Sequence, residues 1–111
     1  MAYDLDLAER VRGLLAAHPG VSERKMFGGL CFLQWGNMTC GVAGDKLMLR
    51  VGPDGYEEAL AQPHAAPMDF TGKPMKGMVY ALPAGLDTDA ALAAWLDRAL
   101  RFSAGLPRKG G

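Results

Sequence analysis

The chain has 111 residues, with 12 Lys and Arg against 12 Asp and Glu, half of its residues apolar and only two cysteines. This composition excludes a disordered chain, a disulfide scaffold and a transmembrane helix of about 20 apolar residues, and its zero net charge provides no broad positive field for nucleic acid. The length is that of one domain, and the acidic N-terminus does not resemble a signal peptide. We therefore expect one cytoplasmic domain over residues 1–111, with a flexible tail at 105–111.

The first predicted element is a helix that runs from about Asp6 to Ala17. Asp6 and Glu9 have the spacing of a capping box, and apolar residues such as Leu7 and Val11 follow at helical spacing. A Pro-Gly pair directly after His18 then stops the helix.

Three short apolar runs follow the helix, at 30–35, 38–43 and 46–51. They are separated by Gly-Asn at 36–37 and by Gly-Asp at 44–45. Two-residue connectors of this kind are typical of β-hairpins, because they tolerate the positive φ that primed turns require. The pattern predicts an antiparallel meander.

The two connectors also predict a register for the meander. The first sets Trp35 opposite Met38. The second sets Ala43 opposite Lys46. Nine apolar residues share one face in this register: Cys31, Leu33, Trp35, Met38, Cys40, Val42, Leu47, Leu49 and Val51. We expect the helices to cover that face, and Trp35→Ala to cost about 3–5 kcal/mol as the loss of a core aromatic residue.

The second half of the chain combines helices and strands, with Pro and Gly residues at most of the predicted limits. In chain order we expect a short helix at 52–62, a loop at 64–77 with a brief strand at 68–70, a strand at 78–82, and a helix that starts at Asp87 or Thr88 and ends at Gly105. The last helix has a wide apolar stripe, so it is predicted to pack against the sheet.

The sequence contains no pattern typical of catalysis or metal binding. Cys31 and Cys40 fall among predicted core residues, so we expect two buried free thiols. A zinc site needs about four ligands, and His18 and His64 are the only histidines. The glycine pair at 28–29 precedes a strand rather than a helix, which does not fit a phosphate-binding loop. We predict a protein that is not an enzyme and uses no cofactor or metal.

Basic residues in predicted loops and on the reverse face of the sheet form the main candidate site. They are Arg24, Lys25, Arg50, Lys73 and Lys76. One interpretation is that they are solvated surface charges, because Lys and Arg are mostly exposed in proteins. The other is a site for an anion or an acidic partner, since a glycine-bounded turn presents side chains and backbone N–H groups to ligands.

A second candidate surface is apolar. Leu30, Phe32 and Met48 share the predicted reverse face with Arg50, where they would form an exposed patch in a monomer. Either another element of the chain or a partner is expected to cover this patch. We accordingly predict a homodimer, formed through the reverse face around Phe32 and Met48 or through an exposed strand edge.

Four segments carry a family resemblance: 24–30, 36–42, 47–51 and 67–77. The last contains the block Met-Asp-Phe-Thr-Gly-Lys-Pro-Met-Lys-Gly, which is the most specific part of the resemblance. Together they resemble the N-terminal domain of the TfoX/Sxy competence-regulator family, from the first helix to Pro107. The resemblance implies an α+β fold of the YgaC/TfoX-N kind, similar in topology to type III secretion chaperones: a curved antiparallel sheet with helices packed on one side.

The resemblance also implies a class of function. The namesakes of the family are bacterial regulators of natural competence that act with a transcription factor of the cyclic-AMP receptor type, and they carry a second, helical domain. The resemblance implies that this chain is a stand-alone, non-enzymatic regulatory module that binds a protein partner. The implied class of partner is a transcription factor, and the family has no established catalytic residues to assign to this sequence. The alternative is a domain that binds a small anionic ligand such as a phosphate or a nucleotide. Direct DNA binding ranks third, because the net charge is zero.

Overall fold

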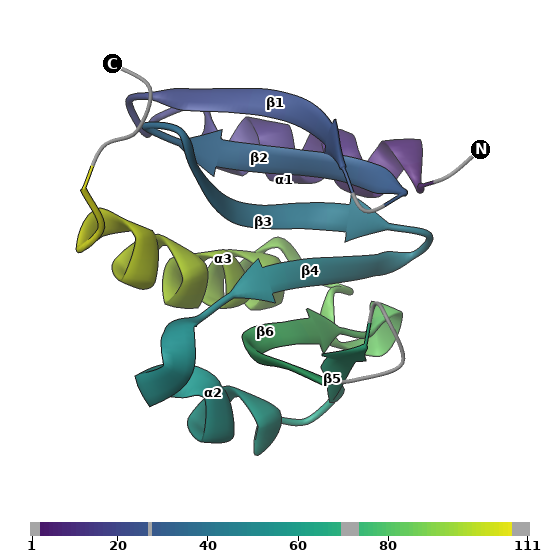
Figure 1. Ribbon diagram of the computed structural model, residues 1–111. Helices are drawn as coiled ribbons and strands as arrows, with labels where there is room; N and C mark the ends of the chain where they lie inside the picture. The colour runs from purple at the N-terminus through teal and green to yellow at the C-terminus, as the bar shows by residue number, and fades with distance from the viewer. Residues whose placement is uncertain (1–2, 27, 70–73, 108–111) are drawn as a thin grey trace.

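The computed structural model describes residues 3–26, 28–69 and 74–107, and within them the chain forms one open antiparallel sheet and three α-helices (Figure 1). In chain order the elements are α1 (Leu5–Leu15), β1 (Val21–Met26), β2 (Gly29–Gln34), β3 (Asn37–Ala43), β4 (Lys46–Arg50), α2 (Gly52–Leu60), β5 (Ala65–Asp69), β6 (Pro74–Ala81), the 3₁₀ turn η1 (Pro83–Gly85) and α3 (Asp89–Ala104). The strand order is β1-β2-β3-β4-β6-β5, so β1 and β5 form the two edges. The α+β class predicted from the sequence is confirmed.

Helix α1 begins two residues earlier than the predicted capping box. Asp4 is its N-cap, and the Asp4 carboxylate accepts hydrogen bonds from the backbone N–H of Asp6 at 2.9 Å and of Leu7 at 3.2 Å. The backbone N–H of Asp4 donates to the carbonyl of Gly44 at 2.8 Å, which ties the start of the helix to the turn between β3 and β4. This hydrogen bond to a turn forty residues away helps to fix Asp4 as the N-cap, in place of the predicted Asp6.

The sequence did not predict strand β1. Its residues read Val-Ser-Glu-Arg-Lys-Met, and the four central side chains are exposed. An edge strand with neither face buried lacks the alternation of apolar and polar residues by which strands are recognised. The segment therefore looked like a linker, although it pairs with β2 along its whole length.

The turn between β2 and β3 lies one residue earlier than predicted. Trp35 has φ of 52° and Gly36 has φ of 82°, so these two residues form the turn and Gln34 pairs with Asn37. The predicted pairing of Trp35 with Met38 is wrong, because Leu33 takes that place. The shift exchanges the two faces of β2, and Trp35 is 37% exposed at the turn instead of buried in the core.

Contacts from distant residues hold this turn. The Trp35 indole lies against Gly20, where an added Cβ would come within 2.3 Å of the ring, and the Trp35 N–H donates to the Gly20 carbonyl at 2.9 Å. The buried Asn37 donates its side-chain N–H to the carbonyl of Pro107 at 2.8 Å. These contacts stabilise a left-handed Trp35, which is otherwise a costly conformation for a bulky side chain. Residues 108–111 of the predicted tail lie outside the described residues.

The remaining elements follow the sequence prediction except in the predicted loop at 64–77, whose described residues lie mainly in β5 and β6. The second hairpin turn stands at 44–45 as predicted, with Ala43 opposite Lys46. Helix α2 is the predicted short helix, while β6 begins at Pro74, four residues earlier than expected, and β5 covers 65–69. Thr88 is the N-cap of α3, and its hydroxyl accepts from the Ala91 N–H at 3.1 Å.

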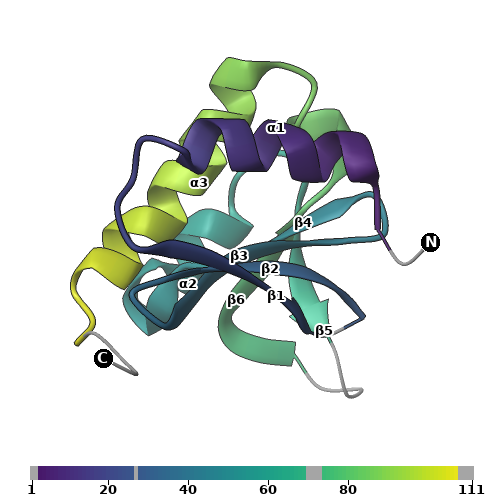
Figure 2. The same ribbon diagram turned by 90° about the horizontal axis from the view of Figure 1, so that it is seen from above.

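The helices cover one face of the sheet, where the main core lies (Figure 2). All three helices and the strands β2, β3, β4 and β6 contribute buried residues to it, including Val11, Ala59, Leu92, Trp95, Phe32, Val42, Leu47, Leu49 and Val79. A smaller cluster lies on the reverse face: Cys31, Leu33, Met48, Met68 and Met78.

The predicted apolar patch on the reverse face is therefore wrong. Leu30 and Phe32 point toward the helices and are buried in the main core, because the turn at Trp35 exchanged the faces of β2. Met48 does lie on the reverse face, but it is fully buried. The three side chains therefore do not form one row on the reverse face, and other elements of the chain bury all of them.

Candidate functional site

The five predicted basic residues do not form one site. Arg24 and Lys25 are exposed on the edge strand β1, whereas Arg50 is half-buried on β4. Three strand spacings separate β1 from β4, which corresponds to about 14 Å. Lys76 is exposed on β6, beside β4, and Lys73 lies outside the described residues.

Arg50 has its own surroundings, apart from the other predicted site residues. Its guanidinium carbon lies 5.3 Å from the centre of the Phe102 ring on α3, a cation–π distance. Its cross-strand partner is Met78, so Lys76 stands two residues further along the neighbouring strand. Among the described residues of the predicted basic set, only Lys76 therefore lies close to Arg50.

The two cysteines are buried and unpaired, as predicted, but they lie on opposite faces of the sheet rather than on the same one. Burial raises the pKa of the Cys31 thiol to about 11, and burial together with the nearby Cys31 raises the pKa of Cys40 further. Both side chains are therefore protonated thiols at neutral pH, and the thiolate is the form that reacts and binds metals.

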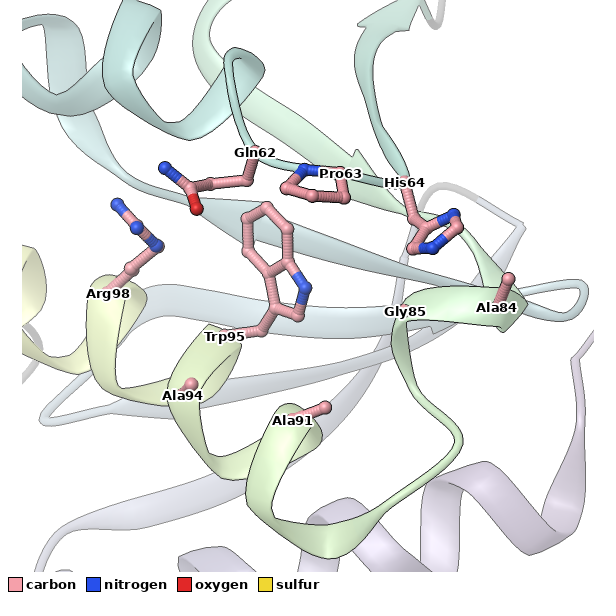
Figure 3. Close-up of a pocket in the computed structure, with 9 residues that line it drawn as sticks. All are labelled: Gln62, Pro63, His64, Ala84, Gly85, Ala91, Ala94, Trp95 and Arg98. Atoms are coloured by element: carbon pink, nitrogen blue, oxygen red, sulfur yellow. The ribbon is translucent and has the colours of Figure 1, made fainter.

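A hollow of about 310 Å³ lies between α3 and the segment that joins α2 to β5 (Figure 3). Trp95 forms its floor, and this side chain is 7% exposed because it also belongs to the main core. The hollow is lined by Gln62, Pro63, His64, Ala84, Gly85, Ala91, Ala94, Trp95 and Arg98. Small side chains on α3 leave the space open above the indole.

His64 is fixed at the rim of this hollow by its backbone. It has φ of 64°, in the left-handed region, and its carbonyl accepts from the Leu82 N–H at 2.8 Å. Gly85 stands directly beside it, and a Cβ there would lie 3.0 Å from the His64 Cβ. A non-glycine residue with positive φ persists when its surroundings hold it, and such residues cluster at functional sites.

Polar groups border the Trp95 indole. The Arg98 guanidinium lies 5.7 Å from the centre of the Trp95 rings, and it donates to the Glu58 carboxylate on α2 at 3.0 Å. The Gln62 amide donates to the Glu58 carbonyl at 3.1 Å. In the part of the chain that the structure describes, neither the indole N–H of Trp95 nor the imidazole of His64 has a hydrogen-bond partner.

A second hollow, of about 270 Å³, continues along the seam between α2 and α3. It is lined by Val51, Gly55, Glu58, Arg98, Arg101 and Phe102. Because Arg98 lines both hollows, we call the two together the α2–α3 groove. The sequence did not predict this groove, because Trp95 and Phe102 fit the apolar core stripe of a helix. The pair Arg98 and Arg101, one helical turn apart beside that stripe, was the feature of the sequence that could have indicated it.

Two further structural findings bear on function. Among residues 3–26, 28–69 and 74–107, no group of three or more His, Cys, Asp or Glu side chains could hold a metal ion. In the same described segments, every helix is too short or too polar to cross a lipid bilayer.

The open sheet with helices on one face and a groove between two of those helices defines an α+β domain with a surface groove. Residues 13–103 match the family model of the TfoX N-terminal domain, and the chain belongs to this family, as the sequence motifs indicated. Searches among curated proteins and among solved structures gave no significant match.

Proposed function

We propose that this TfoX N-terminal domain is a non-enzymatic regulatory module that binds a segment of a partner protein in the α2–α3 groove. The observation that supports the proposal is the floor of the groove. It is a tryptophan ring whose N–H has no partner among the described residues, bordered by His64 and by the ion pair of Arg98 with Glu58. Aromatic and arginine side chains surrounded by a polar rim are the usual composition of binding hot spots.

The size of the groove favours a peptide segment. A hollow of about 310 Å³ is at the lower limit for drug-sized ligands, but it accommodates one large apolar side chain. The segment would stack that side chain on Trp95 and accept a hydrogen bond from the indole N–H. The adjoining hollow near Arg101 and Phe102 would accommodate its neighbouring residues.

The class of partner comes from the family. A transcription factor is what the resemblance to competence regulators implies, and the proposal accordingly includes a location in the cytoplasm. The two free cysteines are consistent with a reducing compartment.

Two matched variants of α3 test the groove. Ala94 lines it, and Ala90 is an exposed alanine one helical turn away that does not. Ala94→Glu places a long charged side chain in the groove, whereas Ala90→Glu adds the same charge outside it. The wild-type chain and both variants would be immobilised, exposed to the same native lysate and compared by quantitative mass spectrometry.

We expect at least one protein to be enriched by the wild-type chain and by Ala90→Glu, and to fall at least tenfold with Ala94→Glu. Thermal unfolding would verify that both variants remain folded. Equal capture by all three chains would show that binding does not use the groove, and capture of a metabolite without any protein would overturn the proposal.

Binding of a small anion is the second candidate, and it now rests on Arg50. In the described part of the chain this half-buried guanidinium stacks on Phe102 and pairs with no carboxylate, and Lys76 stands nearby. A ligand at 100 times its dissociation constant adds about 2.7 kcal/mol of stability. A thermal shift with phosphates or nucleotides that Arg50→Gln abolishes would support this candidate, and no shift with any of them would exclude it.

A further inference from the structure

Strand β1 has β2 as its neighbour on one side, and on the other side no strand from residues 3–26, 28–69 or 74–107 pairs with it, so one row of its backbone groups lies at the edge of the sheet. The hydrogen bond from the Trp35 N–H to the Gly20 carbonyl shows which residues face β2. Hydrogen-bonded pairs alternate along an antiparallel ladder, so Ser22 and Arg24 bond to β2. The backbone N–H and C=O groups of Val21, Glu23 and Lys25 therefore point away from the sheet.

The two edges of the sheet differ in their capacity to accept another strand. The edge strand β5 contains Pro67 in its centre, and proline has no N–H to donate. No proline interrupts β1, and each of its outward-facing residues has both a donor and an acceptor. Of the two edges, β1 is the one suited to strand addition.

A hollow of about 210 Å³ adjoins this edge, between α1 and β1. It is lined by Arg12, Leu15, Ala16, His18, Val21, Glu23 and Phe32. Val21 and Phe32 both pack with the main core, so the hollow lies on the helix side of the sheet. An added strand alternates its side chains between the two faces, and the one beside Val21 would enter the hollow.

The charges along β1 define the partner further. Arg24 and Lys25 are exposed, and neither makes an ion pair with any residue that the structure describes. Glu23 already has a basic partner, because the Arg12 guanidinium donates to its two carboxylate oxygens at 2.6 and 2.8 Å, and the same guanidinium also pairs with Glu9. The unpaired charge of this edge is therefore positive.

We propose that the β1 edge binds an extended acidic segment of another protein as an additional antiparallel strand. Its backbone pairs with Val21, Glu23 and Lys25, acidic side chains lie opposite Arg24 and Lys25, and an apolar side chain fills the hollow beneath α1. A second copy of this chain fits less well. If two copies paired their β1 strands antiparallel about a twofold axis at the middle of the strand, either Arg24 or Glu23 would lie opposite the same residue of the other copy. Like charges directly opposite each other are destabilising. This surface is separate from the α2–α3 groove and does not depend on it.

A designed peptide tests the proposal. The acetylated sequence Thr-Glu-Glu-Thr-Thr-Leu-Thr, aligned antiparallel to β1, sets its two glutamates opposite Lys25 and Arg24 and its leucine opposite Val21. A control peptide carries lysines in place of the glutamates. Each would be titrated into the full chain while backbone amide chemical shifts are recorded by NMR.

We expect the acidic peptide to shift amides of β1 and of the residues that line the hollow, and the lysine peptide to bind at least tenfold more weakly. Arg24→Glu should weaken binding of the acidic peptide at least tenfold. Lys25→Pro should weaken it more than Lys25→Gln, because proline also removes the outward N–H. Lys76→Glu makes an equal charge change on β6 and should leave the affinity within twofold.

Other results would overturn the proposal. These are no shift at millimolar peptide, equal binding of the two peptides, or unchanged binding by Arg24→Glu. Shifts of β1 amides that depend on protein concentration without any peptide would show that a second copy occupies the edge instead. That result would support the homodimer predicted from the sequence.

Discussion

The two faces of the sheet are packed in different ways. The helix-covered face buries branched aliphatic and aromatic side chains from three helices and from the sheet. The buried cluster on the reverse face consists of side chains from strands alone, and three of its five members are methionines. Methionine is unbranched and adapts to irregular space, whereas branched side chains have few rotamers. We infer that the helix-covered face specifies the fold and that the reverse face tolerates change.

Truncation of Phe32 should give the largest loss of stability. This residue is 1% exposed and packs in the helix-covered core, so Phe32→Ala is expected to cost about 3–5 kcal/mol. Urea unfolding followed by circular dichroism measures the change. A loss below 1 kcal/mol would mean that β2 has the register first predicted, with Phe32 on the reverse face.

The matching truncation on the reverse face should cost less. Met48 is fully buried, but its neighbours include Met68 and Met78, whose flexible side chains can move into the vacated space. We expect Met48→Ala to cost about 2–3 kcal/mol, at the lower end for such truncations. The same urea titration applies, and a cost equal to that of Phe32→Ala would remove the distinction between the two faces.

Trp35 should contribute less than either of these residues. It is 37% exposed at the turn, where its ring and its backbone N–H contact Gly20. In Trp35→Ala the residue must still adopt positive φ, but the contact of the ring with Gly20 is lost. We expect the substitution to lower the free energy of unfolding by about 1 kcal/mol. The sequence alone predicted about 3–5 kcal/mol for the same substitution, and the measured value decides between the two registers.

The ion pair of Glu23 with Arg12 should give the smallest effect. The hydrogen bond from Arg12 lowers the pKa of Glu23 below its usual 4.5, so the folded state is stabilised above that pH and loses this stabilisation as the pH falls through the lowered value. Both side chains are partly exposed, and such pairs contribute little and weaken with salt.

Glu23→Gln serves to measure that contribution. The difference in stability between wild type and variant should be present at pH 7, shrink below about pH 4.5 and fall in high salt. A difference that stays constant down to pH 3 would show that the pair does not contribute.

Local rules predicted the elements whose determinants are local. The turn at 44–45 and the cap at Thr88 depend on residues within a few positions, and the structure confirms both. The turn at Trp35, by contrast, is not determined by neighbouring residues alone. Contacts from Gly20 and Pro107, far away in the sequence, select a turn that begins with tryptophan instead of the Gly-Asn pair.

The candidate site was harder to predict than the fold. The residues of its first hollow come from three segments, the connection between α2 and β5, the turn η1 and the helix α3, and no spacing in the sequence shows that these segments meet. Trp95 was correctly expected to be buried, but burial alone does not indicate that one edge of its ring faces a hollow. Arg24 and Lys25 were correctly selected by residue type, whereas their place on an edge strand required the fold.

The positions of the two tryptophans have a practical consequence. The chain has two tryptophans, and they report on different surfaces. Trp35 lies against Gly20 at the start of β1, and Trp95 forms the floor of the α2–α3 groove. An indole in water emits at longer wavelengths than one in an apolar environment, so the intrinsic fluorescence contains one component from each surface. Trp35→Phe and Trp95→Phe would isolate the two components, and quenching or a spectral shift would show which surface a ligand occupies without any label.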